Sequence, residues 1–191
     1  MAIQLFYITK KEEFMKRLFD IILSALCLVL FSPLITACYK QERIGLHGEP
    51  FYIYKFRSMI VDAEKENEEL LQQDDDPRLT KIGKFLRSHH LDELPQLWNV
   101  FVGDMSFVGP RPERKYYIDK IMKLDPRYEK LYKIRPGVTS YATLHNGYTD
   151  TMEKMLRRLE SDLYYLEHMS LWMDIKILAK TFWSIVSGKI F

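Results

Sequence analysis

The sequence predicts a mixed α/β protein (α+β) that is mostly helical, with an N-terminal re-entrant membrane helix, a small β-hairpin and interfacial amphipathic helices. Three observations support this class. Residues 21–38 are apolar and uncharged, residues 51–56 are β-prone, and several later segments space their apolar residues at the helical period. The chain has 191 residues, which is enough for one domain with a substantial core.

Composition narrows the possible partners. The net charge is only +2, so no strong field favours nucleic acid, and no nucleic acid is expected as a partner. Aromatic residues make up 14% of the chain, which argues against disorder. Both cysteines, Cys27 and Cys38, fall in the apolar segment. They do not form the spacing of a disulfide framework, and a reducing compartment is the simplest interpretation.

The apolar segment predicts contact with a membrane. As a helix, residues 21–38 would be about 27 Å long, against a hydrocarbon core of about 30 Å. Pro33 removes a backbone hydrogen bond, so a kink is expected near Ser32 and Pro33. Basic residues flank both ends and give no clear orientation. A helix that bends there and returns would keep both flanks cytoplasmic. A spanning helix, a core helix, and a lipoprotein signal cleaved before Cys38 remain alternatives.

The next part of the chain combines a hairpin and short helices. A hairpin is expected over residues 44–60, because residues 45–48 favour a turn and residues 51–56 are β-prone. Residues 61–73 are acidic and helical in type, and the aspartates that follow them open a loop. Another short helix is expected over residues 80–88.

The second half of the chain is predicted to be mainly helical. The apolar spacing over residues 92–101 fits a helix, and glycines and prolines impose a stiff loop over residues 103–112. Helices are expected over residues 116–133 and 152–168. Residues 171–186 are rich in apolar residues and contain two tryptophans and two lysines. This helix either lies in the headgroup plane or packs in the core.

Two adjacent acids are the first candidates for chemistry. Asp92 suits the N-cap of the predicted helix, Glu93 its first turn, and Pro95 is tolerated there. Both acids could simply complement the helix dipole. Alternatively, the helix N-terminus stabilises an ionised Asp92 as a nucleophile and favours bound phosphate. Glu93 would then hold a divalent cation, because hard oxygen ligands suit Mg²⁺.

Several cations could accompany these acids. Each alone is typical of a solvated surface residue, but together they could bind a diphosphate, with arginine forks gripping its oxygens. The sequence shows no zinc-spaced Cys/His cluster, phosphate-binding glycine motif or serine nucleophile elbow. The candidate binding residues are Lys55, Arg57, Arg87, Arg111 and Arg135.

These residues lie in motifs that resemble a known family over nearly the whole chain. The motifs are KQERIG (40–45), FYIYKFRSM (51–59), LRSHHLDELPQLWNVFVGDMSFVGPRP (86–112), RPGVTS (135–140) and MKRLFDIILSALCLVLFSPLI (15–35). They are similar to the bacterial sugar transferase family. Its members include the small monotopic phosphoglycosyl transferases that begin glycan assembly on polyprenol phosphate.

The resemblance implies a two-step phosphoglycosyl transfer. Asp92 would attack the β-phosphate of a UDP-sugar, release UMP and pass the phosphosugar to polyprenol (undecaprenyl) phosphate. Glu93 matches the family's second acid, which is associated with Mg²⁺. Asp162 matches a further family acid. The basic positions that match those holding phosphates or nucleotide are Lys55, Arg87, Arg111 and Arg135.

The resemblance also implies a location and a pathway class. Residues 1–40 would be the membrane-associated re-entrant part, and residues 41–191 a catalytic domain on the cytoplasmic face of the inner membrane. A homodimer is one possible assembly. The expected role is in exopolysaccharide, lipopolysaccharide or capsule biosynthesis.

One departure from the family pattern suggests a second function. Only residues 36–39 separate the SPLI and KQERIG motifs, so the returning arm and the first strand are expected to be shortened. The alternative is therefore a catalytically impaired, membrane-bound relative that binds nucleotide-sugar or scaffolds a glycan-assembly complex.

Overall fold

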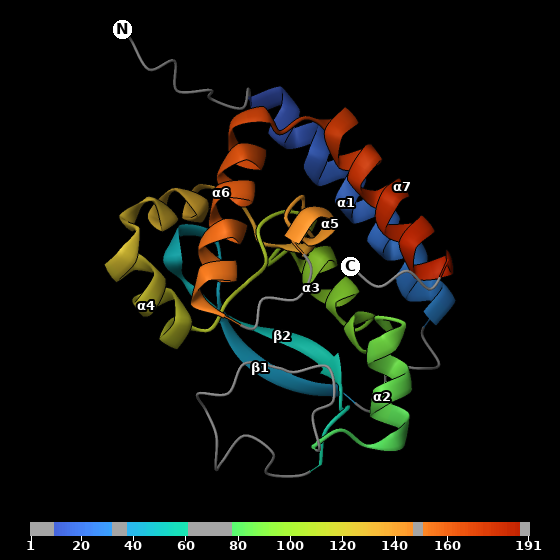
Figure 1. The fold of residues 1–191 in the computed structure, drawn as a ribbon. Helices are drawn as coiled ribbons and strands as arrows, with labels where there is room; N and C mark the ends of the chain where they lie inside the picture. The colour runs from blue at the N-terminus through green and yellow to red at the C-terminus, as the bar shows by residue number, and fades with distance from the viewer. Residues whose placement is uncertain (1–9, 32–37, 61–77, 147–150, 188–191) are drawn as a thin grey trace, which may run out of the picture.

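A computed structural model describes residues 10–31, 38–60, 78–146 and 151–187 (Figure 1). The protein is mostly helical, with a two-stranded antiparallel sheet and a short parallel pair, which confirms the predicted α+β class. With η denoting a 3₁₀-helix, the elements are α1 (Lys10–Phe31), β1 (Cys38–Ile44), η2 (Leu46–Gly48), β2 (Pro50–Phe56), α2 (Lys81–Ser88), η3 (Leu91–Glu93), α3 (Gln96–Val102), β3 (Ser106–Val108), α4 (Lys115–Leu124), η4 (Pro126–Lys133), β4 (Gly137–Thr139), α5 (Thr143–Asn146), α6 (Met152–His168) and α7 (Leu171–Ser187).

Two apolar clusters form the interior. The first gathers around α3 and β3 and includes Val100 and Val108, with Tyr165 from α6. The second joins α4, η4 and α6 and includes Ile121 and Leu159. Because α6 supplies residues to both clusters, it connects the two halves of the core, and Figure 1 shows it standing between α4 and the helices α1 and α7.

The hairpin lies earlier in the chain than predicted. Strands β1 and β2 pair antiparallel from Cys38 opposite Phe56 to Ile44 opposite Pro50, so the first strand precedes the turn-forming residues. The predicted range 44–60 was wrong, because the charged sequence of β1 hides its alternation. Strands β1 and β2 have seven residues each, and the expectation that the first strand is shorter than the family's stays a prediction.

Helix α1 corrects the predicted apolar helix over residues 21–38. It begins at Lys10, well before the apolar segment, while Cys38 opens β1. The predicted bend at Ser32 and Pro33 lies outside the described residues. Within the described ranges, no helix combines the length and the apolar character needed to cross a membrane.

The polarity of α1 is the reverse of that of a helix on a water-soluble domain. Its polar residues Asp20 and Ser24 are buried against the protein, whereas Ile22, Leu26 and Val29 are exposed. A helix in water normally turns its apolar stripe inward. The outer face of α1 therefore suits an apolar medium better than water.

Helix α7 has the same reversed polarity and runs beside α1 along one flank of the molecule (Figure 1). Asp174 and Ser184 are buried, while Trp172, Phe182 and Trp183 are exposed. The predicted helix over residues 171–186 is confirmed. The two outer faces together form a broad apolar flank, which we call the α1–α7 flank.

The other helices confirm or refine the predictions. The helices over residues 80–88 and 152–168 are confirmed, with Thr80 and Thr151 as their N-caps. The predicted helix over residues 116–133 is divided at Asp125 into α4 and η4. The short parallel pair of β3 and β4 within the loop regions was not predicted.

Helix α2 packs unusually close to the backbone that precedes it. A Cβ atom on Gly83 would lie 1.8 Å from the carbonyl oxygen of Ser58, which also accepts a hydrogen bond from the backbone N–H of Thr80. Only a residue without a side chain allows this approach.

Replacing Gly83 with alanine should therefore lower stability, although alanine is the better helix former by about 1 kcal/mol. Displacing the backbone contact should cost about 1–3 kcal/mol and outweigh that gain. Thermal unfolding of Gly83→Ala tests this, with the exposed Lys81→Ala as a control expected to change little. An unchanged or higher midpoint for Gly83→Ala would contradict the tight contact.

Candidate active site

The two acids lie in a tight turn between α2 and α3. His90 adopts a left-handed conformation (φ 53°) and precedes η3, which contains Asp92 and Glu93. Helix α3 begins only at Gln96, with Pro95 at its N-cap, so the prediction that Asp92 caps this helix was wrong. The turn buries Asp92, which is 6% exposed.

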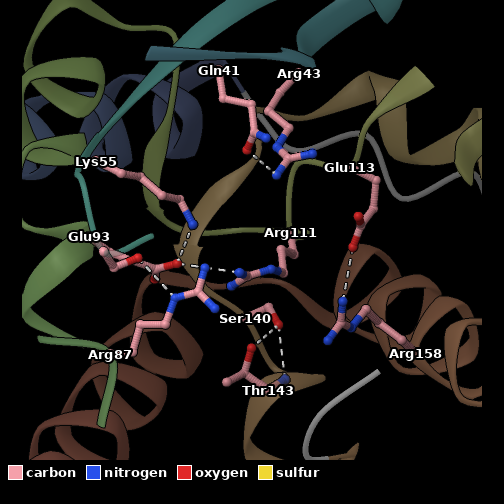
Figure 2. Close-up of polar contacts among 11 residues, drawn as sticks. Gln41, Arg43, Lys55, Arg87, Glu93, Arg111, Glu113, Ser140, Thr143 and Arg158 are labelled. Carbon is pink, nitrogen blue, oxygen red and sulfur yellow. Dashed lines mark hydrogen bonds and ion pairs between the residues drawn. The ribbon is translucent and has the colours of Figure 1, made fainter. Parts of the chain in front are cut away.

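Glu93 is held by two cations from distant parts of the chain (Figure 2). Its Oε1 accepts a hydrogen bond from Lys55 Nζ at 2.8 Å and from Arg111 Nη2 at 3.3 Å. Lys55 comes from β2, and Arg111 lies between two prolines after β3. The hairpin and the segment after β3 therefore meet at Glu93.

Two further arginines lie near these residues: Arg87 near Asp92, and Arg43 near enough to Lys55 to lower its pKa. Arg87 stands in the last turn of α2, where its Nε donates to Ser58 Oγ at 3.0 Å, and its charge lowers the pKa of Asp92 against the larger effect of burial. Arg43 on β1 donates to Gln41 Oε1 at 2.6 Å and lies above Arg111 in Figure 2. Arg43 was not among the candidates predicted from the sequence. Only its place within the KQERIG motif could have indicated a role at the site.

The environment moves the pKa values of the two acids in opposite directions. Burial and the neighbouring Glu93 raise the pKa of Asp92, although Lys55 and Arg87 oppose this. Burial also acts to raise the pKa of Glu93, but Lys55 and Arg111 together hold it well below its usual range. When adjacent acids have pKa values pushed apart, their chemical roles differ.

The pKa values of Lys55 and Arg111 are also shifted. Burial lowers the pKa of Lys55, and the charges of Arg111 and Arg43 lower it further, while Glu93 and Asp92 oppose the change. Glu93 raises the pKa of Arg111. Glu93 therefore acts as the shared counter-ion that keeps Lys55 and Arg111 together beside Asp92.

Three predicted binding residues lie apart from these contacts. Arg57 follows the end of β2 and stands over the ring of Tyr39, 5.8 Å from its centroid. Arg135 donates from Nε to the carbonyl oxygen of Gly103 at 2.8 Å, near the end of α3. The structure thus brings Lys55, Arg87 and Arg111 together with the acids. The substrate-binding roles of Arg57, Arg135 and Asp162 remain predictions.

Asp162 lies in a small cavity behind Arg111. Arg111, Glu113, Tyr128 and Arg158 share the lining of this cavity. Arg158 Nη1 donates to Glu113 Oε1 at 3.0 Å, while Asp162 Oδ1 is buried without a hydrogen-bond partner. Burial raises the pKa of Asp162 to about 8, against the opposing charge of Arg158. Burial therefore favours the protonated form of Asp162 more than that of an ordinary aspartate.

The chain matches the model of the bacterial sugar transferase family over residues 11–188, and it belongs to this family. The resemblance read from the motifs is confirmed.

Three relatives illustrate the match. The chain is 41% identical over 181 residues to the UDP-glucose:undecaprenyl-phosphate glucose-1-phosphate transferase of Klebsiella pneumoniae, covering 87% of this chain and 39% of that protein. It is 37% identical over 188 residues to the UDP-N-acetylgalactosamine-undecaprenyl-phosphate N-acetylgalactosaminephosphotransferase of Aeromonas hydrophila, covering 92% and 44%. It is 38% identical over 187 residues to a UDP-glucose:undecaprenyl-phosphate glucose-1-phosphate transferase of Caulobacter vibrioides, covering 90% and 70%. The chain thus spans less than half of the first two relatives.

The raised pKa of Asp162 predicts a specific dependence of stability on pH. An unfolded aspartate has a pKa of about 3.9, so the folded state binds this proton more tightly. The resulting stability is fully present below about pH 4 and is lost as the pH rises through about 8. Asp162→Asn should flatten this decline and exceed the wild type in stability above about pH 8. Thermal midpoints across pH test this, with the exposed Asp119→Asn as control. Parallel curves for Asp162→Asn and wild type would contradict the assignment.

Proposed function

We propose that this chain transfers a sugar 1-phosphate from a UDP-sugar to undecaprenyl phosphate and releases UMP. The observation that carries the proposal is the pair of adjacent acids in which Glu93 is neutralised by Lys55 and Arg111 while Asp92 is buried beside it. The activities for which the three relatives are named support the same substrates.

The chemistry divides into two displacements at one phosphorus atom. A carboxylate oxygen of Asp92 bonds to the β-phosphorus, and the bond to the oxygen bridging the two phosphorus atoms breaks, so UMP leaves with the electron pair. An oxygen of undecaprenyl phosphate then attacks the same phosphorus and releases Asp92. The raised pKa of Asp92 makes its carboxylate a better nucleophile than an ordinary aspartate.

The cations make the first displacement possible. A diphosphate repels an anionic nucleophile until positive charge offsets both. Lys55 and Arg111 lie on the oxygen of Glu93, and Arg87 stands near enough to lower the pKa of Asp92. In this arrangement, Asp92 is the reacting acid and Glu93 keeps the cations in place.

We infer that Mg²⁺ assists with the diphosphate. In the described part of the chain, no group of three or more acidic, histidine or cysteine side chains converges on a metal site. Mg²⁺ commonly takes only one or two carboxylates and completes its shell with water and substrate phosphates, and an adjacent Asp–Glu pair suits that habit. Glu93 would supply a carboxylate oxygen to the ion, and the ion would offset diphosphate charge.

The α1–α7 flank supports a membrane location. Both helices bury polar residues and expose large apolar ones, which is unfavourable in water and favourable against lipid. We propose that the chain sits monotopically on the cytoplasmic face of the inner membrane. This seating would place the site near a lipid-borne acceptor.

The catalytic proposal predicts the effect of a single substitution. In an assay with Mg²⁺, undecaprenyl phosphate and a panel of UDP-sugars, wild-type protein should release UMP from at least one donor. Asp92→Asn removes the nucleophile and should reduce UMP release by at least about a thousandfold. The exposed Asp119→Asn is the matched control. Binding of a UDP-sugar without UMP release by wild-type protein would instead indicate the non-catalytic alternative.

The membrane proposal predicts which surface binds lipid. Replacing Ile22 and Val29 of α1 with aspartate should reduce flotation of the protein with liposomes, because charge would then face the hydrocarbon. Leu124 on α4 is as exposed as Ile22, at 61%, but lies off the α1–α7 flank. Leu124→Asp should therefore float like the wild type. Equal losses for both variants would contradict a specific lipid-binding flank.

A further inference from the structure

Lys16 of α1 reaches from the apolar flank into the core. Its Nζ donates to the carbonyl oxygen of Val108 at 3.1 Å, to the hydroxyl of Tyr165 at 3.2 Å and to Asp174 Oδ2. A lysine ammonium has three hydrogens, so these three acceptors use its full donor capacity. Tyr165 also donates to Asp174 Oδ1 at 2.6 Å, which joins α1, α6 and α7 in one network.

The same face of α1 completes the hydrogen bonding of β3. Asp20, one helical turn after Lys16, accepts a hydrogen bond from the backbone N–H of Phe107 at 3.2 Å. The partner strand of β3 is β4, through Ser106 and Val108. Side chains of α1 therefore bind β3 at Phe107 and Val108, at the end of the strand that leads to Arg111.

The segment from Val108 to Arg111 has little freedom to absorb a shift. Gly109 donates to the carbonyl oxygen of Thr139 at 3.0 Å, and the carbonyl oxygen of Pro110 accepts from the backbone N–H of Gly137 at 2.9 Å. Prolines on both sides of Arg111 restrict its backbone further. We therefore expect a displacement of Val108 to shift the backbone at Arg111, whose guanidinium contacts Glu93.

We propose that Lys16 is a positioning residue that holds Arg111 in place for the diphosphate, so that the lipid-facing helix α1 sets the geometry of the active site. The inference rests on the proposed function for the identity of the ligand. Lys16 would thus contribute to substrate binding although it lies far from Asp92 and Glu93 along the chain.

A double-mutant cycle with UDP as the probe tests the proposal. The dissociation constant for UDP, with Mg²⁺ present, is measured by titration calorimetry for wild type, Lys16→Met, Arg111→Met and the double variant. Lys16→Met should weaken UDP binding about tenfold when Arg111 is present, and by less than about twofold when Arg111 is methionine. If Lys16 only stabilises the fold, its effect will be equal in both backgrounds, and the proposal is overturned.

Two further variants separate positioning from general damage. Arg17→Met changes the next residue of α1, whose guanidinium binds the carbonyl oxygens of Val100 and Phe101 on α3 rather than β3. Any effect of Arg17→Met should add to that of Arg111→Met. If Lys16→Met does not fold, Tyr165→Phe replaces it in the cycle. It removes the hydroxyl that contacts Lys16 and Val108, and additive behaviour would again overturn the proposal.

The readout distinguishes this inference from the proposed function, because UDP binding does not require turnover. UDP binding with the expected coupling but without UMP release would overturn the transfer reaction and support the positioning role. UMP release with additive effects on UDP binding would support the reaction and overturn the role of Lys16. Wild-type protein that does not bind UDP would overturn both.

Discussion

The structure depends on keeping two carboxylates side by side in a poorly hydrated turn. Two adjacent anions repel each other, and breaking a buried ion pair costs about 3–5 kcal/mol. Glu93 meets this constraint through Lys55 and Arg111, which come from the hairpin and from the segment after β3. The hairpin therefore has a function beyond its small sheet, because β2 delivers an ammonium to the acids. Pro110 and Pro112 restrict the backbone of Arg111, whose guanidinium also contacts Glu93.

A second constraint concerns the exposed apolar side chains of α1 and α7, which need an environment that removes them from water. Each large apolar side chain left in water forfeits about 1.5–3 kcal/mol of burial energy. Covering the α1–α7 flank with lipid would recover this energy without help from the protein core. The inner faces are then free to carry polar groups such as Lys16 and Asp174, which fix the position of the helices through directional contacts rather than apolar packing.

Sequence reasoning succeeded where local chemistry decides the structure. The helical period of α6 and the cap at Thr80 are local signals, and both helices were predicted. Strand β1 was missed because its polar and charged residues leave no alternating apolar stripe. The contact of Arg135 with Gly103 could not be predicted, since it depends on how elements far apart in sequence pack. The same limit explains why Arg43 was not named as a candidate.

The adjacent acids show how one short turn can produce two chemical roles. A carboxylate whose oxygen is shared by two cations is a poor nucleophile, because its charge is already neutralised. Glu93 is in that position. Asp92 is buried next to this neutralised partner, and its pKa is raised by burial and by Glu93 itself. Both acids lie in the 3₁₀ turn that follows the left-handed residue His90. The difference between the acids thus comes from their environments and not from their residue types.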